Sequence, residues 1–374
     1  MRPARDPGSS ATSSARKPSA SSKRASSSEG WGDEASFRRI AESHRREIQL
    51  HCYRLVGSLH DAEDLTQDTF LRAWQGITRF EGRTTVRNWL YRIATNVCLT
   101  AISKRSIPRR VLPESVAGPT RRMPRGSPAD DVPWIEPYPD SELEGSADSS
   151  ADPRSRYEMR EAVRLAFIAV TQRLPARQRA VLLLRDVLGW SADETAQALE
   201  MTVASTNSAL QRGRRTLGKT LSREEIASQP PGGTRLQDVA ERYATAWENG
   251  DLEGLTALLA KDAAMNMPPW KEWYKGRARI RAFFAYAFDW AWSSPVGSFR
   301  MVPTRANAEA AFGTYVRRPG ESRYHPHALQ VLTVNEGRIV RLTLFVGSRF
   351  FSAFGLPSEL GSEAKGTPRA SRPA

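Results

Sequence analysis

The sequence predicts a multidomain fold: two all-α helical domains, the second with a helix-turn-helix, joined by a long flexible linker and followed by a C-terminal α+β domain. Three observations carry this prediction. Apolar residues recur at spacings of three and four in two separate stretches, which is typical of amphipathic helices. A segment rich in Pro, Ser, Asp and Glu separates these stretches. Near the C-terminal end, alternating apolar residues flank a turn at 335–337, which indicates a β-hairpin.

Changes in composition place the domain boundaries. The first 30 residues are rich in Ser, Ala, Arg and Pro and cannot bury enough apolar surface to become ordered. They are interpreted as a disordered tail, with an upstream start codon or a basic arm that touches nucleic acid as alternatives. The predicted segments are a disordered tail (1–35), a first helical domain (36–105), a flexible acidic linker (106–153), a second helical domain (154–224), a short linker (225–235), an α+β domain (236–356) and a second disordered tail (357–374).

The overall charge restricts the class of partner. The 374 residues carry a formal net charge of +14, which favours a polyanion, either nucleic acid or an anionic membrane. No apolar run reaches the roughly 18–20 residues of a membrane span, so nucleic acid is the stronger expectation and no membrane partner is expected. Cys52 and Cys98 are the only cysteines. They are too few for a disulfide framework or a zinc site, and they favour a reducing, cytoplasmic location. No cofactor is expected.

One helix stands out against this basic background. The stretch HDAEDLTQDTFLRAW, residues 60–74, has four carboxylates and no base before Arg72. Asp61 is expected to cap the helix, and acidic residues in the first turn suit the helix dipole. Leu65, Phe70 and Trp74 form an apolar stripe toward the core. An acidic surface on so basic a chain predicts a positively charged partner.

The segment Leu174–Leu217 has the layout of a helix-turn-helix. Ser191 and Glu194 form a capping box for a short helix, and a tight turn at 200–202 leads to a longer helix. In such motifs the early residues of the second helix reach base edges, and arginines near its end hold phosphates. The candidate DNA-binding residues are Ser205, Thr206, Asn207, Ser208, Gln211, Arg212, Arg214 and Arg215. A plain helical hairpin with a solvated basic face is the alternative.

Three motifs in this order resemble the sigma-70 family, extracytoplasmic-function (group IV) class. They are DAEDLTQDTFLRAW, FEGRTTVRNWLYRIATNVCLTAISKR and LPARQRAVLLLRDVLGWSADETAQALEMTVASTNSALQRGRRTL, and the resemblance covers about residues 37–222. It implies an alternative sigma factor that binds core RNA polymerase and promoter DNA. The acidic helix would bind the basic β′ clamp helices through Asp61, Glu63, Asp64, Gln67 and Asp68.

The same resemblance assigns roles to the other segments. The helix at 85–105 would read the minus-ten element and hold the melted strand, and the helix-turn-helix domain would read the minus-thirty-five element beside the β flap. The minus-ten candidates are Arg87, Asn88, Trp89, Tyr91, Arg92 and Asn96. Trp89 is interpreted as a core residue more readily than a DNA contact. The linker would thread toward the polymerase active-site cleft. Ala209 and Gly213 depart from the family pattern, where Arg and Ala are usual.

The C-terminal domain resembles the SnoaL-like domains of the nuclear transport factor 2-like superfamily. The resemblance rests on LQDVAERYATAWENGDLEGLTALLAKDAAMNMPPW and the later strand pair, and it implies an α+β cone around a pocket. The pocket candidates are Trp270, Trp273, Tyr274, Asp289, His325 and His327. Enzymes of this fold use a pocket Asp or His as acid or base.

The sequence has no Ser-His-Asp order, Gly-rich phosphate loop or zinc motif. Regulation of the sigma domains, with a small-molecule ligand of the pocket, is therefore preferred to catalysis. Two alternatives stay open: a SnoaL-like enzyme or ligand sensor fused to a DNA-binding module, and a self-standing repressor. The sequence identifies no anti-sigma factor.

Overall fold

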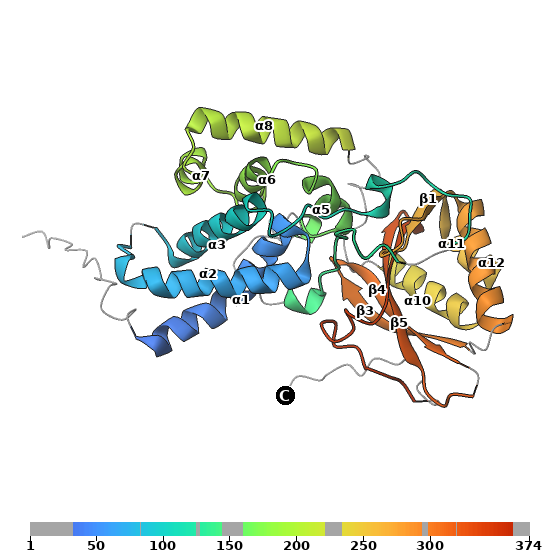
Figure 1. The fold of residues 1–374 in the computed structure, drawn as a ribbon. Coiled ribbons are helices and arrows are strands. Elements are labelled where there is room, and N and C mark those ends of the chain that lie inside the picture. The colour runs from blue at the N-terminus through green and yellow to red at the C-terminus, as the bar shows by residue number, and fades with distance from the viewer. Residues whose placement is uncertain are drawn as a thin grey trace, which may run out of the picture.

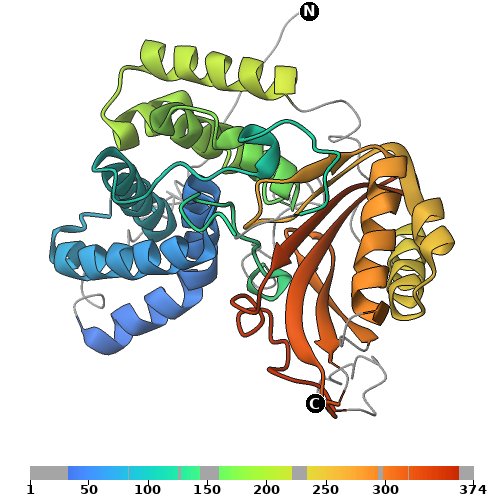
Figure 2. The same ribbon diagram turned by 45° about the vertical axis from the view of Figure 1, so that its right-hand side comes forward.

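The computed structural model describes residues 33–82, 84–124, 128–143, 160–220, 234–293, 298–318 and 320–361. Most of the predicted N-terminal tail, of the C-terminal tail and of the second linker lies outside the described residues. Figures 1 and 2 show a helical part beside a part built on one twisted sheet. This arrangement confirms the predicted fold class.

Three helices make the first helical domain: α1 (Glu34–Val56), α2 (Leu59–Gly76) and α3 (Val86–Ser103), with a short 3-10 turn, η1 (Ile77–Arg79), after α2. α1 ends at Gly57, whose φ of 74° suits a residue without a β-carbon. The N-cap of α2 is Ser58, whose hydroxyl accepts a hydrogen bond from the Asp61 backbone N–H at 3.1 Å. The prediction that Asp61 caps this helix is therefore wrong, because the helix begins earlier.

The second helical domain contains α5 (Leu165–Thr171), α6 (Ala176–Leu182), a π-helical segment η4 (Leu183–Val187), α7 (Ala192–Leu199) and α8 (Val203–Thr220). The predicted capping box is present. Ser191 Oγ accepts from the Glu194 N–H at 3.1 Å, and Glu194 Oε2 accepts from the Ser191 N–H at 2.8 Å. Glu200 ends α7 in the left-handed region and turns the chain into α8. The helix-turn-helix is thus confirmed.

The C-terminal domain places three helices over one face of a six-stranded sheet (Figure 2). The helices are α10 (Thr234–Glu248), α11 (Leu252–Leu258) and α12 (Arg277–Ser293). The strands are β1 (Leu259–Asn266), β2 (Trp273–Lys275), β3 (Ser298–Ala306), β4 (Glu309–Arg317), β5 (His325–Asn335) and β6 (Arg338–Val346). Their order is β2-β1-β6-β5-β4-β3, and only the pair β1 and β6 is parallel. The predicted hairpin turn joins β5 to β6.

The central strands are buried on both faces. Ala310 and Phe312 of β4 belong to the core under the helices, whereas Ala311 and Tyr315 belong to a second core on the other face. Alternation along a strand sends neighbouring side chains to opposite faces. The second core is continuous with those of both helical domains, so the outer face of the sheet is an interface.

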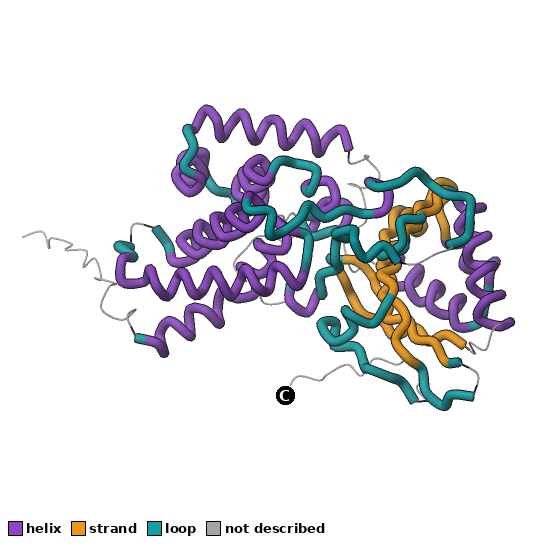
Figure 3. Tube along the Cα trace, viewed as in Figure 1, coloured by secondary structure: helices purple, strands orange, loops and turns teal. Residues whose placement is uncertain are grey.

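The linker is packed, and the prediction that it is flexible is wrong for its described residues. Ile135 and Tyr138 are fully buried, and two 3-10 turns, η2 (Pro113–Ser115) and η3 (Asp140–Glu142), shape the chain. Figure 3 shows this segment running as loop between the helices and the sheet. Its two aromatic residues, Trp134 and Tyr138, lie in the stretch WIEPYPD. They cannot form a core alone, but they fill the space between domains that already have cores.

Candidate functional site

The acidic helix α2 presents its polar side outward. Asp64, Gln67 and Asp68 are exposed, and Glu63 is half-buried. Leu65 is 5 % exposed and packs into the domain core, as predicted. These side chains are free to meet a positively charged surface, and the resulting field would steer such a partner toward α2.

An apolar groove lies beside these carboxylates. It has a volume of about 620 Å³ and runs between α1 and α2. Trp74 packs against Phe37 with ring centroids 5.1 Å apart, yet 38 % of Trp74 and 60 % of Leu71 remain exposed. Trp74 is therefore only partly a core residue. The surface combines acidic and apolar groups, which is typical of a protein-binding site.

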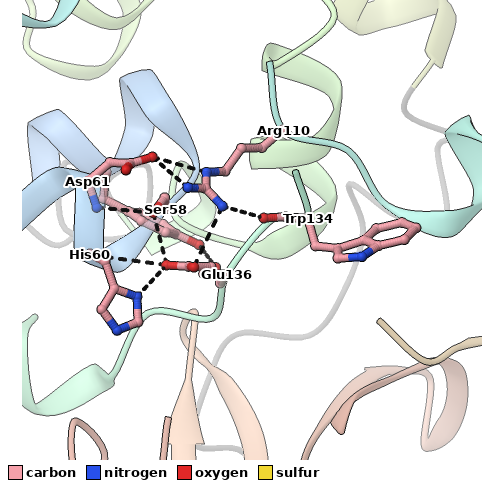
Figure 4. A network of polar contacts seen from close by, with 7 residues as sticks. Ser58, His60, Asp61, Arg110, Trp134 and Glu136 are labelled. Atoms are coloured by element: carbon pink, nitrogen blue, oxygen red, sulfur yellow. Dashed lines mark hydrogen bonds and ion pairs between the residues drawn. The ribbon is translucent and has the colours of Figure 1, made fainter. Parts of the chain in front are cut away.

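Asp61 differs from the other acidic residues because it already has a cationic partner. Arg110, from the linker, lies 2.6 Å from Asp61 Oδ2 through Nη2 and donates through Nη1 to the Trp134 carbonyl at 3.0 Å. Figure 4 shows the linker closing over the start of α2 at this point. The Asp61 side chain is thus covered by this chain's own linker.

Glu136 anchors the same network (Figure 4). Its Oε2 accepts a hydrogen bond from Ser58 Oγ at 2.9 Å and lies 2.9 Å from His60 Nδ1. Burial would raise the pKa of Glu136, but the contact with His60 and the charge of Arg110 outweigh burial and hold the pKa below its usual range. A buried carboxylate of the linker therefore stays ionised against the N-terminus of α2.

The candidate minus-ten residues divide between surface and core. Arg92 is exposed, and Asn88 is half-buried. Tyr91 is 1 % exposed and donates a hydrogen bond to Glu47 at 3.1 Å, so its predicted DNA contact is wrong for this arrangement. The packing of the preceding turn places the Tyr91 side chain in the core. The helical spacing of the sequence alone did not predict this burial.

The remaining minus-ten candidates have partners within the chain. Arg87 pairs with Glu47 at 2.7 Å. Trp89 is half-buried and packs against Phe80 with ring centroids 5.0 Å apart, in accord with its interpretation as a core residue. Asn96 donates through Nδ2 to the Ala198 carbonyl of α7 at 3.3 Å. Helix α3 therefore contacts the helix-turn-helix domain.

The recognition helix α8 exposes most of its predicted DNA-binding residues. Those exposed are Asn207, Ser208, Gln211, Arg212, Arg214 and Arg215. Ser205 is half-buried beside Thr202. Arg214 pairs with Asp186 at 2.6 Å. Thr206 is fully buried, so its predicted base contact is wrong.

The two departures from the family pattern lie on the inner face of α8. Ala209 is 2 % exposed, and a β-carbon at Gly213 would approach Leu182 to 3.2 Å. Small residues are therefore needed for close packing of α8 on α6. Neither position lies on the exposed face of α8 that carries the candidate DNA-binding residues.

A buried arginine joins the two helical domains. Arg179 of α6 donates to Gln172 Oε1 at 2.8 Å and to the Leu55 carbonyl at the end of α1. Gln172 Nε2 donates to the same carbonyl at 3.2 Å. Burial lowers the pKa of Arg179 to about 10, so the guanidinium remains charged at neutral pH and compensates the orphan carbonyl at the helix end.

The β3–β4 hairpin inserts its tip into a junction of three segments. Asn307 is fully buried, and its Nδ2 donates to the Tyr53 hydroxyl of α1 at 2.8 Å and to the Val163 carbonyl at 2.7 Å. Its Oδ1 accepts from the Tyr138 N–H of the linker at 2.9 Å. Both Asn307 and Ala308 have positive φ, as a two-residue hairpin turn requires. One side chain thus bonds both helical domains and the linker.

Asp140 of η3 supports this hairpin from the linker side. Its Oδ1 accepts from the Ala308 N–H at 2.8 Å, and its Oδ2 accepts from Arg305 Nε at 3.0 Å. Burial raises the pKa of Asp140, although both hydrogen bonds act against that rise. We refer to Asn307, Ala308 and their partners Tyr53, Tyr138, Asp140 and Val163 as the hairpin junction.

Glu309, next to the hairpin junction, is 5 % exposed and makes the folded chain sensitive to pH. Burial raises its pKa to about 7, against the charges of Arg164 and Arg341 and a hydrogen bond from Thr333; Glu161 adds to the rise. Between pH 4.5, its ordinary pKa, and pH 7, the folded state holds a proton that the unfolded chain has lost. Stability therefore falls as pH rises through this window and changes no further above it.

We expect Glu309→Gln to remove this dependence. At pH 8 the variant should exceed the wild type in free energy of unfolding by roughly 3 kcal/mol, and at pH 4.5 the two should nearly coincide. Denaturant unfolding at several pH values measures the difference. The exposed Glu336→Gln is the control, and parallel curves for wild type and Glu309→Gln would contradict the assignment.

A cavity of about 260 Å³ opens between α10, α12 and the sheet. Its lining is mostly apolar, with Thr314, His327 and Gln330 as polar members, and the linker contributes Pro124. Of the predicted pocket residues, Trp270 and His327 line this cavity. Asp289 and His325 are exposed and lie outside it.

Trp273 and Tyr274 hold the linker instead of forming cavity walls. Trp273 Nε1 donates to the Ala117 carbonyl at 2.7 Å, and the Tyr274 hydroxyl donates to the Arg122 carbonyl at 3.1 Å. Sequence reasoning missed the walls from α10 and α12, Trp247, Phe283, Tyr286 and Ala287. The helical periodicity of these residues predicts ordinary core positions. Whether such a residue lines a cavity or fills the core depends on the curvature of the sheet, which the sequence does not show.

Comparison with known proteins matches each part of the chain. Residues 40–107 match sigma-70 region 2, residues 164–217 match sigma-70 region 4, and residues 240–342 match the SnoaL-like domain. The ECF RNA polymerase sigma factor SigG of Mycobacterium tuberculosis is 39 % identical over 326 residues, which cover 87 % of this chain and 85 % of SigG. SigW of Bacillus subtilis is 28 % identical over 190 residues, which cover 51 % of this chain and 91 % of SigW.

A solved structure has a similar fold. The sigma factor SigJ of Mycobacterium tuberculosis superposes with a TM-score of 0.52 at 19 % identity, covering 86 % of this chain and 99 % of SigJ. The matches to sigma-70 regions 2 and 4 and to SigG define the class as a transcription initiation protein that binds core RNA polymerase and promoter DNA. The chain belongs to the ECF RNA polymerase sigma factors and carries a SnoaL-like domain at its C-terminal side. None of the described helices is long and apolar enough to cross a membrane.

Proposed function

We propose that the SnoaL-like domain regulates this sigma factor by holding its two helical domains together, in a closed arrangement that core polymerase must open. The first helical domain, which matches sigma-70 region 2, is called sigma domain 2, and the second, which matches region 4, is called sigma domain 4. The hairpin junction carries the proposal, because the buried Asn307 side chain bonds to Tyr53 of sigma domain 2, to Val163 beside sigma domain 4 and to Tyr138 of the linker. A buried polar group with all its partners in place fixes one arrangement of the segments around it. In this role the domain performs no covalent chemistry.

The polymerase-binding surface supports a closed state. Asp64, Gln67 and Asp68, with Glu63 at their edge, are proposed to bind the β′ clamp helices, and Asp61 is proposed to join them after opening. In the closed state Asp61 is held by Arg110. A cationic clamp helix would have to replace this guanidinium, so linker and polymerase compete for one carboxylate.

Promoter geometry supports the same view. The minus-ten and minus-thirty-five elements are centred about 25 base pairs apart, or about 85 Å at roughly 3.4 Å per base pair. Asn96 of α3 contacts Ala198 of α7 at 3.3 Å, so the proposed minus-ten helix packs against the helix-turn-helix domain. The chain cannot span both elements without separating its sigma domains. We place this step in the cytoplasm, with sigma domain 4 beside the β flap.

A distance measurement tests the proposal. Spin labels on Ser103→Cys in α3 and Gln197→Cys in α7 sit on exposed positions near the contact, whereas Cys52 and Cys98 are buried. We expect one short distance in the free chain and a much longer distance once core polymerase and a cognate promoter are bound. The control pair Ser103→Cys and Ser43→Cys, within sigma domain 2, should not change. A long distance in the free chain would refute the closed state.

A further inference from the structure

We propose that the interface between the sheet and the helical domains holds a proton-binding site at Glu309, and that opening of the closed arrangement releases this proton. The coupling to opening rests on the proposed function, whereas the proton site itself is a property of the closed interface. Acid should therefore favour the closed chain. Rising pH should favour the open chain, which binds core polymerase.

Glu309 points into the domain interface. Side chains alternate between the two faces of a strand, and Ala311 and Tyr315 of β4 belong to the core that the sheet shares with the helical domains. Glu309 precedes them in the same alternation, so it lies on this face, where it is buried. Separation of the sheet from the helical domains would therefore expose its carboxyl group to water.

Glu309 is the third carboxylate beside two guanidinium groups. On the sheet side, Arg341 of β6 pairs with Glu114 of the linker. On the helical side, Arg164 Nε lies 3.0 Å from Glu161 Oε1. Glu309 Oε2 accepts no hydrogen bond from the part of the chain that the structure describes. Because both guanidinium groups already pair with another carboxylate, an ionised Glu309 adds surplus negative charge to a buried site, which is costly.

A proton on Glu309 removes this surplus charge. Burial outweighs the attraction of both neighbouring guanidinium groups and raises the pKa of Glu309 to about 7. In the open chain, hydration would return the pKa to its ordinary value of 4.5. Opening between these two pH values therefore releases one proton, so the opening equilibrium rises with pH. The rise is about tenfold between pH 6 and pH 8, and it ends above that range.

Other ionisable groups near the site are separated from Glu309 by the choice of variant. The Tyr53 hydroxyl of α1 stays protonated, because burial raises its pKa. Asp140 of the linker pairs with Arg305 at 3.0 Å, and burial raises the pKa of Asp140 as well. Any pH dependence from Asp140 or His60 must persist in Glu309→Gln. Only the part that this substitution removes belongs to Glu309.

Hydrogen exchange of two backbone amides measures opening in the full-length chain. The Asn307 N–H donates to the Tyr138 carbonyl at 2.9 Å, and the Ala308 N–H donates to Asp140 Oδ1 at 2.8 Å. Both bonds join the hairpin to the linker, so these amides exchange only when the hairpin leaves the junction. After correction for the intrinsic exchange rate at each pH, we expect their protection to fall about tenfold between pH 6 and pH 8.

Three variants assign this effect to the carboxyl group. Glu309→Gln cannot ionise, so its protection should stay constant over this range and exceed that of the wild type about hundredfold at pH 8. Glu309→Asp keeps a titratable group and should keep a pH dependence. Glu336→Gln, which removes an exposed carboxylate between β5 and β6, should behave as the wild type. Equal pH dependence in the wild type and Glu309→Gln would overturn the proton site.

Polymerase binding tests the regulatory consequence. The affinity of the wild type for core polymerase, divided by that of Glu309→Gln at the same pH, should rise about tenfold between pH 6 and pH 8. The titration of polymerase itself cancels in this ratio. A constant ratio would overturn the coupling to polymerase binding. A long distance between positions 103 and 197 in the free chain at pH 6, with both amides still protected, would refute the proposed function and leave the proton site intact.

Discussion

Replacing Asn307 by alanine is expected to raise the apparent affinity of the chain for core RNA polymerase by about tenfold to hundredfold. The change removes three side-chain hydrogen bonds at the hairpin junction, at 2.7, 2.8 and 2.9 Å. At about 1 kcal/mol each, their loss destabilises the closed state by about 3 kcal/mol. A destabilisation of about 3 kcal/mol raises the fraction of open, binding-competent chain by about a hundredfold at most. The apparent affinity rises with this fraction until the open state dominates.

The measurement is a titration of core polymerase with labelled chain, alongside spin-label distances for the variant. Asn335→Ala is the matched control, because Asn335 ends β5 at the tip of the other hairpin and makes no hydrogen bond to the described part of either sigma domain. It should leave affinity unchanged. If Asn307→Ala opens the chain but does not bind polymerase more tightly, the closed state is not inhibitory.

Reversing two exposed charges on α2 is expected to have the opposite effect. Asp64→Lys with Asp68→Lys should weaken binding of core polymerase at least a hundredfold, because close charge pairs across an interface couple by about 1.5–7 kcal/mol. Both side chains are exposed, so the fold should not change. Asp61 is left intact, because its reversal would also break the pair with Arg110.

The control for this pair changes the net charge equally. Asp238→Lys with Glu241→Lys alters two exposed carboxylates on α10 of the SnoaL-like domain, and polymerase binding should persist. Circular dichroism and thermal unfolding establish that both double variants are folded. The difference in polymerase affinity between the α2 double variant and the wild type should be largest at low salt, where charges are least screened. Equal affinities for the two double variants would show that α2 is not the polymerase-binding surface.

The local patterns of the sequence predicted the elements well. The capping box at Ser191, the turn before α8 and the hairpin at 335–337 depend on residues close together in the chain, and the structure confirms them. The exposure of the α2 carboxylates was equally predictable, because a run of acidic residues without basic partners is too costly to bury. The errors at Tyr91 and Thr206 have one cause. Polar side chains on a helix were taken as surface residues, although hydrogen bonding or tight packing allows them in a core.

The linker shows the limit of such reasoning. Its average composition is polar, and this suggested flexibility. Ile135 and Tyr138 are nevertheless fully buried, because three domains meet around them. Composition reports whether a segment can form its own core and says nothing of cores that other segments leave open.

The sequence by itself determined the helices, the helix-turn-helix, the α+β character of the last domain and the sigma-factor family. Only the tertiary structure decided that Asn307 enters a junction of both sigma domains, that Arg110 covers Asp61 and that Pro124 reaches the cavity. The physical reason is range. Helical periodicity and capping act over a few residues, whereas these contacts join positions from 49 to 254 residues apart and exist only after the domains have packed.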